Sequence, residues 1–194
     1  MLDPCRTSIV NPFTFAQFIV TSEDGVRKQI LLELHQLAVH IVLFEPEIPP
    51  NTGSVARLCA ATLTPLHLIE PLGFKIDDKH LKRAGLDYWE FVDLRVHGCW
   101  DEFLSSARPG KMLFFSKRAV RSYTSVRYGE NDFLVFGPET RGLPQDLLEA
   151  NPDTALRIPM MGRGVRSLNL SNAVSIVLYE GLRQLGKTCD FRGP

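Results

Sequence analysis

The sequence has few cysteines and no long apolar run, and these absences exclude several classes of protein. Its four cysteines, Cys5, Cys59, Cys99 and Cys189, are far apart and show neither C-x-x-C pairing nor histidines at zinc-ligand spacing. Free thiols and no metal site are expected. No apolar stretch approaches the roughly 20 residues of a membrane helix, and no signal-peptide pattern opens the chain. We expect a soluble, cytoplasmic protein with no membrane segment.

The sequence also lacks a surplus of charge, since Lys plus Arg and Asp plus Glu both number 22. Nucleic-acid binding draws on positive surface near the phosphates, so the overall charge gives no support for it. A local cluster would have to supply the positive charge. Taken alone, the candidates are better explained as ordinary solvated surface: Lys79, Lys82, Arg83, Lys117, Arg118, Arg121, Arg127, Arg163 and Arg166.

What is present is a regular alternation of apolar runs and helical patterns within 194 residues, enough for one globular domain. The apolar runs predict strands over residues 40–44, 66–70, 91–96, 112–115, 133–136 and 156–158. The helical patterns predict helices over residues 54–63, 78–84, 100–107, 145–150 and 172–185. This alternation predicts an α/β fold, with a mainly parallel sheet that carries helices on both faces.

Residues 1–38 do not follow the alternation and offer a single helical pattern at 26–37. We interpret them as an N-terminal extension, disordered or not native, ahead of a domain that spans 39–194. One hypothesis places the native start near Val39, because a valine codon can initiate translation in bacteria and the first predicted strand begins there.

Three motifs stand where a predicted strand gives way to a turn or a helix, the place where open α/β sheets bind ligands. The first is N-T-G-S-V-A-R at residues 51–57, after a stiff proline-containing segment. Asn51 or Thr52 is predicted to cap the helix that carries Arg57. On its own, this motif predicts no more than a capped helix with a surface arginine.

The second and third motifs are F-G-P-E-T-R-G-L-P at residues 136–144 and R-S-L-N-L-S-N at residues 166–172. In the second, Gly137 and Gly142 allow the backbone to approach a ligand closely. In the third, Ser171 or Asn172 is predicted to cap the last helix. Capping explains one of these polar residues and leaves the others for another role.

Together, and in this order, the three motifs resemble those of the SPOUT superfamily of RNA methyltransferases, from about Val39 to Gly186. The likeness is strongest to the small single-domain members that methylate the wobble nucleotide of tRNA. It implies S-adenosylmethionine as the cofactor, tRNA as the partner, and a homodimer with Tyr179 near its interface. It also implies a C-terminal trefoil knot, a rare exception to the rule that chains stay unknotted.

The resemblance also implies roles for individual residues. The cofactor pocket is expected to be lined by Phe115, Gly137, Glu139, Ile158 and Ser167. The catalytic residues are expected to be Arg57, Ser167 and Asn169. A charged guanidinium has a pKa above about 12 and only donates hydrogen bonds, so we expect Arg57 to hold a phosphate and stabilise developing alkoxide rather than act as a base. RNA contacts are expected from Arg83, Lys117, Arg141 and Arg166.

The reaction implied is 2′-O-methylation of the ribose of a wobble cytidine or modified uridine, with leucine tRNAs as the expected substrates. Two alternatives stay open. The enzyme could act on another tRNA or rRNA ribose, since related SPOUT enzymes carry similar motifs. The chain could also be a non-catalytic RNA-binding protein, although it shows no RRM, KH or OB signature.

Two other functions, a nucleotide hydrolase and an oxidoreductase, are not supported by the surrounding sequence. Residues 181–188 match the pattern of a phosphate-binding P-loop, but a helical pattern rather than a strand precedes the first glycine. A dinucleotide-dependent oxidoreductase is suggested by the sheet pattern alone, because no G-x-G-x-x-G follows the first predicted strand.

Overall fold

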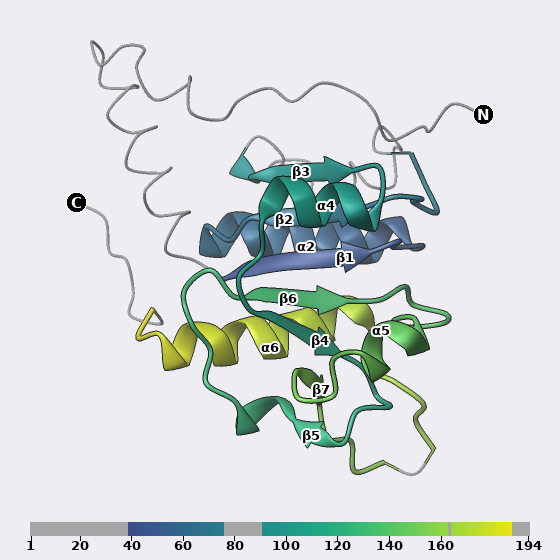
Figure 1. Cartoon of the computed structure of the whole chain (residues 1–194), viewed down its shortest axis with the longest axis vertical. Helices are drawn as coiled ribbons and strands as arrows, with labels where there is room; N and C mark the ends of the chain where they lie inside the picture. The colour runs from purple at the N-terminus through teal and green to yellow at the C-terminus, as the bar shows by residue number, and fades with distance from the viewer. Residues whose placement is uncertain (1–38, 76–90, 163, 188–194) are drawn as a thin grey trace.

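A parallel sheet forms the centre of the molecule (Figure 1). The computed structural model describes residues 39–75, 91–162 and 164–187. Within them, the sheet has seven strands in the order β3-β2-β1-β6-β4-β7-β5, and each hydrogen-bonded pair is parallel. The strands are β1 (His40–Phe44), β2 (Leu66–Ile69), β3 (Leu94–His97), β4 (Met112–Phe115), β5 (Arg121–Ser122), β6 (Phe133–Phe136) and β7 (Ala155–Arg157).

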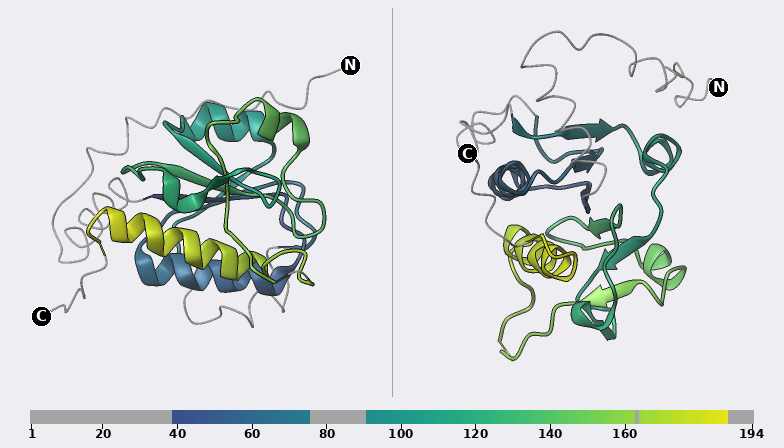
Figure 2. Two further views of the ribbon diagram at one scale, coloured as in Figure 1. Left: turned by 90° about the horizontal axis from the view of Figure 1, so that it is seen from below. Right: turned by 90° about the vertical axis from the view of Figure 1, so that its left-hand side faces the viewer.

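Helices cover both faces of the sheet, as predicted from the sequence. Helices α2 (Pro49–Thr62) and α6 (Leu170–Gln184) lie side by side on one face, and α4 (Trp100–Ala107) and α5 (Gln145–Glu149) lie on the other (Figure 2). Successive side chains of β1 point to opposite faces of the sheet, so β1 contributes to the hydrophobic core on each face. Ile41 and Leu43 pack with α2 and α6, whereas Val42 packs with α4 and α5.

The predicted boundaries are correct for four elements: β1, β4, β6 and α4. The prediction missed β5, placed the start of β3 three residues too early and shifted β7 by one residue. β5 has two residues and exists through its pairing with β7, so no local pattern marks it. The helices predicted at 26–37 and 78–84 lie outside the described residues.

Helix α2 begins five residues earlier than predicted, and the proposed cap by Asn51 or Thr52 is wrong. The N-cap position is Ile48, which makes no side-chain hydrogen bond to the helix. Pro49 and Pro50 form the start of the first turn, where the missing N–H groups cost nothing because they would have no helical partner. Asn51 therefore lies inside the helix, and its side chain is free of any capping role.

Three buried histidines form a hydrogen-bonded row across β1, β2 and β3. His40 Nδ1 lies 3.0 Å from His67 Nε2, and His67 Nδ1 lies 3.0 Å from His97 Nε2. The row ends where His97 Nδ1 lies 3.2 Å from Ser106 Oγ on α4. Burial lowers the pKa of His67 to about 2 and also lowers the pKa of His97. Both imidazoles are therefore neutral at pH 7.

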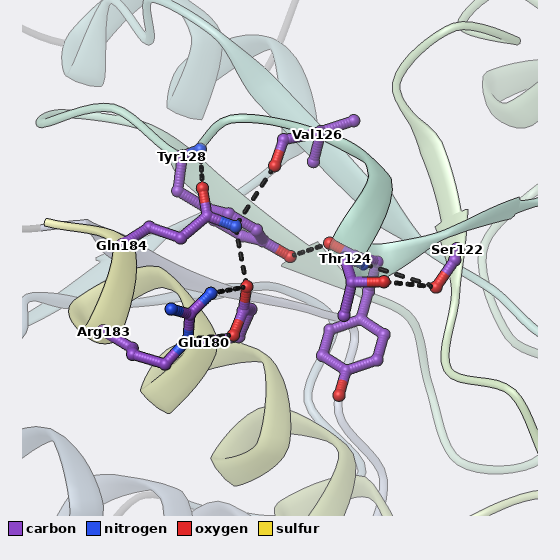
Figure 3. Close-up of polar contacts among 8 residues, drawn as sticks. Ser122, Thr124, Val126, Tyr128, Glu180, Arg183 and Gln184 are labelled. Atoms are coloured by element: carbon purple, nitrogen blue, oxygen red, sulfur yellow. Dashed lines mark hydrogen bonds and ion pairs between the residues drawn. The ribbon is translucent and has the colours of Figure 1, made fainter.

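The end of α6 is anchored to the loop that precedes β6 (Figure 3). The Gln184 side chain accepts a hydrogen bond from the Tyr128 backbone N–H at 3.2 Å and donates to the Val126 carbonyl at 3.3 Å. The buried ring of Tyr128 packs against Gly181, where a Cβ would lie 3.2 Å from the ring. Gly181 is thus part of a packed helix, which confirms that no P-loop begins there.

Two described cysteines, Cys59 and Cys99, are not in a disulfide. Burial raises the pKa of the Cys59 thiol, which makes this side chain a neutral part of the core. Across the described part of the chain, no helix is long and apolar enough to cross a membrane.

Candidate functional site

A cleft of about 560 Å³ lies at the carboxyl ends of the parallel strands. Its walls come from the residues that follow β4, β6 and β7, from the start of α2 and from the segment that leads into α6. This is the edge where open α/β sheets place ligands, and the volume suits a small organic molecule. The cleft contains all the predicted cofactor residues: Phe115, Gly137, Glu139, Ile158 and Ser167.

The aromatic ends of β4 and β6 form an apolar wall of this cleft. The rings of Phe115 and Phe136 stack with centroids 4.8 Å apart and an interplanar angle of 16°. Both side chains are more than nine-tenths buried. The wall is rigid because it belongs to adjacent central strands, and it offers an apolar surface to a flat ligand.

The loop after β6 folds back tightly on itself at Gly137. A Cβ at this position would lie 2.3 Å from the Leu143 backbone N, closer than packed atoms can approach. Gly142 closes the turn with φ of +70°, a conformation that glycine adopts without strain. The sequence predicted that these glycines let the backbone approach a ligand. The structure adds a second reason for Gly137, which is the packing of the loop against its own backbone.

A line of side-chain amides and a carboxylate joins all three motifs at the cleft. Asn169 Nδ2 donates to Asn51 Oδ1 at 2.9 Å, and Asn51 Nδ2 donates to Glu139 Oε1 at 2.9 Å. The other carboxylate oxygen, Glu139 Oε2, accepts from the Glu47 backbone N–H at 2.9 Å. Glu139 is therefore engaged by protein groups at both oxygens and holds the loop in place.

A second carboxylate ties the same loop to the segment before α2. Glu47 accepts hydrogen bonds from both the backbone N–H and the hydroxyl of Thr140, at 3.0 and 2.8 Å. These bonds lower the pKa of Glu47, so it remains ionised at neutral pH. Nearby, Arg141 forms an ion pair with Glu45. Three consecutive loop residues, 139 to 141, are thus held against residues 45–51.

Asn169 caps α6, so the predicted cap by Ser171 or Asn172 is wrong. Its Oδ1 accepts from the Ser171 N–H at 2.9 Å and from the Asn172 N–H at 3.4 Å. The same side chain donates to Asn51 from its other end. Both ends of the amide are occupied, so this residue fixes the start of α6 relative to α2 and the cleft.

Two basic side chains predicted to contact RNA, Lys117 and Arg141, line the cleft. Arg118 lines it as well, although it was predicted only as part of a general basic cluster. Arg166 lies just before the cleft residue Ser167 and does not itself line the cleft.

Arg57 lies on the exposed face of α2 and is not among the cleft-lining residues. Arg83 lies outside the described residues.

Asn51 is the site residue that sequence reasoning missed. It stood in the first motif, but the local pattern suggested a helix cap. Its two partners lie 88 and 118 residues away in the sequence, so no short-range signal could reveal them.

The residues present fit S-adenosylmethionine, which has a flat base, a ribose and a charged amino-acid end. The stacked Phe115 and Phe136 offer an apolar wall, and the chain from 137 to 142 offers backbone polar groups beside it. Among residues 39–75, 91–162 and 164–187, no group of three or more His, Cys, Asp or Glu side chains is placed to hold a metal ion.

Comparisons with known proteins agree on one group. The model of the SpoU rRNA Methylase family matches residues 38–179. A tRNA (cytidine(34)-2′-O)-methyltransferase of Saccharophagus degradans is 54% identical over 148 residues, covering 76% of this chain and 96% of the relative. The Escherichia coli K12 protein of the same name is 51% identical over 149 residues, covering 76% and 94%.

Solved structures give the same result. One that concerns 2-OH methylation of C/U34 on tRNA has a TM-score of 0.73 and 50% identity, covering 78% of this chain and 98% of that one. The SpoU methyltransferase AviRb of Streptomyces viridochromogenes, in complex with AdoMet, has a TM-score of 0.67 at 21% identity, covering 77% and 58%. At that identity, AviRb shows a shared fold.

Proposed function

Because the chain belongs to the SpoU rRNA methylase family, we propose that it transfers a methyl group from S-adenosylmethionine to the ribose 2′-oxygen of the wobble nucleotide of tRNA. The observation that carries this proposal is the hydrogen-bonded line from Asn169 through Asn51 to Glu139, which brings three distant motifs to one cleft. The relatives that are more than half identical over three quarters of this chain support the choice of tRNA and of nucleotide 34.

When bound, S-adenosylmethionine supplies a methyl group on a positively charged sulfur, which is already a good electrophile. The protein therefore contributes mainly by positioning and by excluding water. Phe115, Phe136 and Ile158 would hold the flat, apolar part of the cofactor. The backbone from Gly137 to Gly142 would hold polar groups, and Glu139 would act indirectly by fixing that backbone.

The residues near the reacting ribose either position other groups or contact the RNA directly. Asn169 is a positioning residue, because its amide is already hydrogen-bonded at both ends and holds the start of α6 against α2. The exposed Ser167 hydroxyl in the cleft can hydrogen-bond the ribose. Arg57, exposed on α2 outside the cleft, would hold an RNA phosphate and stabilise negative charge as it develops on the 2′-oxygen. Lys117 and Arg166, together with Arg83, would hold further RNA phosphates, and Arg141, paired with Glu45, would contact the RNA from the wall of the cleft.

The proposal has finer features, which rest on the resemblance of the three motifs. The nucleotide is cytidine or modified uridine, with leucine tRNAs as substrates, and the protein acts in the cytoplasm. The domain spans 39–194, with 1–38 as an extension. Its last segment would form a trefoil knot, and the position of residues 167–170 and of the loop after β6 around one cleft supports this.

We also propose a homodimer built on α6. Ile176 and Tyr179 are exposed, at 38% and 51%, and they share one face of the helix. Both are large apolar or amphipathic side chains on the solvent side of α6, which is typical of a surface that pairs with a partner.

The proposal is tested by measuring transfer of labelled methyl from S-adenosylmethionine to tRNA by the whole protein and three variants. Arg57→Ala and Asn169→Ala should each lower kcat/KM for tRNA at least tenfold. Arg95→Ala is the matched control, because Arg95 is an exposed arginine on β3, which β2 and β1 separate from the cleft strands, and it pairs with Asp93. Wild-type protein that binds S-adenosylmethionine but labels no tRNA would overturn the proposal. Label in another ribose would keep the reaction and change the target.

A further inference from the structure

A second cleft of about 390 Å³ adjoins the first. It lies between the end of β1, the turn after β4 and the beginning of α5. Arg118, Arg141 and Gly142 line both clefts, so the two form neighbouring compartments with a common wall. An RNA chain that places one ribose in the first cleft can therefore place an adjacent nucleotide in the second.

The lining of the second cleft combines apolar surface with planar polar groups. Phe44, Leu143 and Pro144 supply the apolar part, and Gln145 supplies an amide. Guanidinium groups stack on nucleobases and hydrogen-bond their edges, and unstacked bases of single-stranded RNA are recognised in this way. The chemistry of the lining therefore suits a nucleobase.

The two arginines are held in place by protein partners. Arg118 Nη1 donates to Gln145 Oε1 at 3.0 Å, and Gln145 Nε2 donates to Glu149 Oε1 at 2.9 Å. The backbone N–H of Arg118 donates to Ser116 Oγ at 3.2 Å, which fixes the turn after β4. A guanidinium fixed by one hydrogen bond keeps its plane and its remaining donors for a ligand.

The charge distribution favours a base over a phosphate in this compartment. The Glu45 carboxylate lines the second cleft and forms an ion pair with Arg141, so one of the two positive charges is already neutralised. A phosphate would have to approach this carboxylate, whereas an uncharged base would not. Arg118 is bonded to a neutral amide and is the side chain best placed to contact the ligand.

We propose that this second cleft binds the unstacked nucleobase of a nucleotide next to the methylated one, with Arg118 as a specificity-determining residue. This inference rests on the proposed function, because the RNA must first place its target ribose in the adjacent cleft. Through this compartment, the enzyme would recognise the identity of a neighbouring base in the anticodon loop, or the ease with which that base unstacks.

The test is steady-state kinetics with full-length tRNA, at saturating S-adenosylmethionine. Arg118→Ala should raise KM for tRNA about tenfold, as expected for loss of one base-stacking contact, and leave kcat within twofold. Arg118→Lys should not restore KM, because lysine keeps the charge and loses the plane. Arg95→Ala, on β3 and outside both clefts, should behave as wild type. Calorimetry should give the same affinity for S-adenosylmethionine in all four proteins.

A second arm identifies the base by using tRNA with an abasic nucleotide on either side of the target. One of the two substrates should raise the wild-type KM about tenfold and cause no further rise with Arg118→Ala. The inference is overturned if Arg118→Lys restores KM, which indicates a phosphate contact. It is also overturned if Arg118→Ala has the wild-type KM for tRNA. The same holds if each abasic substrate raises KM further in Arg118→Ala by as much as it does in the wild type. Wild-type protein that methylates no tRNA would instead overturn the proposed function, and this inference with it.

Discussion

The histidine row predicts that the fold loses stability as the pH falls below neutrality. His67 is fully buried and neutral in the folded protein, with a pKa of about 2. In the unfolded chain, a histidine takes up a proton near its ordinary pKa of about 6.5. Below that pH the unfolded state binds more protons than the folded state, so stability is complete above pH 6.5 and falls as the solution becomes more acidic. For His67 alone, the free energy of unfolding should drop by about 2 kcal/mol between pH 7.5 and pH 5.0.

Urea denaturation followed by circular dichroism at both pH values measures this loss. The wild-type midpoint should fall by about 1 M at pH 5.0, with an unchanged slope. His67→Gln should be less stable at pH 7.5, since it breaks the row. Its unfolding should take up about one proton fewer at acidic pH, so its stability should depend less on pH. The reasoning is refuted if wild-type stability is the same at both pH values, or if His67→Gln shows the full wild-type dependence on pH.

Three further predictions concern single side chains. Gly137→Ala should weaken binding of S-adenosylmethionine at least tenfold by calorimetry, because its Cβ would clash with the loop backbone. In Gly142→Ala the Cβ meets no atom within 4 Å, and the positive φ should cost about 1 kcal/mol of stability. Equal binding by both variants would contradict this. Thr52→Val should raise the free energy of unfolding by about 1 kcal/mol, because the Thr52 hydroxyl is buried with no hydrogen-bond partner in the described residues. Gln184→Ala should lower it by about 1–3 kcal/mol through loss of the hydrogen bonds in Figure 3, and a change under 0.5 kcal/mol would count against that anchor.

Much of the fold could be predicted because the central strands are fully buried and apolar. Runs such as F-L-V-F in β6 and M-L-F-F in β4 are covered by helices on both faces, so each run marks a strand with its correct boundaries. The start of α2 was mistaken because two consecutive prolines suggest an extended segment, whereas prolines are also well suited to a first helical turn.

The site was predictable where a family motif marks it and not where long-range bonds create it. Phe115, Gly137 and Ile158 were expected from the resemblance, and the structure places them in one cleft. The role of Asn51 depends on partners in two distant motifs. Similarly, Arg118 belongs to two clefts only because the turn after β4 meets the beginning of α5, which no local sequence pattern indicates.

The most direct test of the proposed function is to locate the methyl group. Transfer RNA from cells that lack the gene would be incubated with the purified protein and S-adenosylmethionine, digested, and the fragments sequenced by mass spectrometry. We expect one added methyl group, on the ribose 2′-oxygen of the wobble nucleotide, and at least tenfold less of it with Asn169→Ala at the same enzyme concentration and short reaction time. A methyl group on a base, or no methyl group with cofactor-bound wild-type protein, would contradict it.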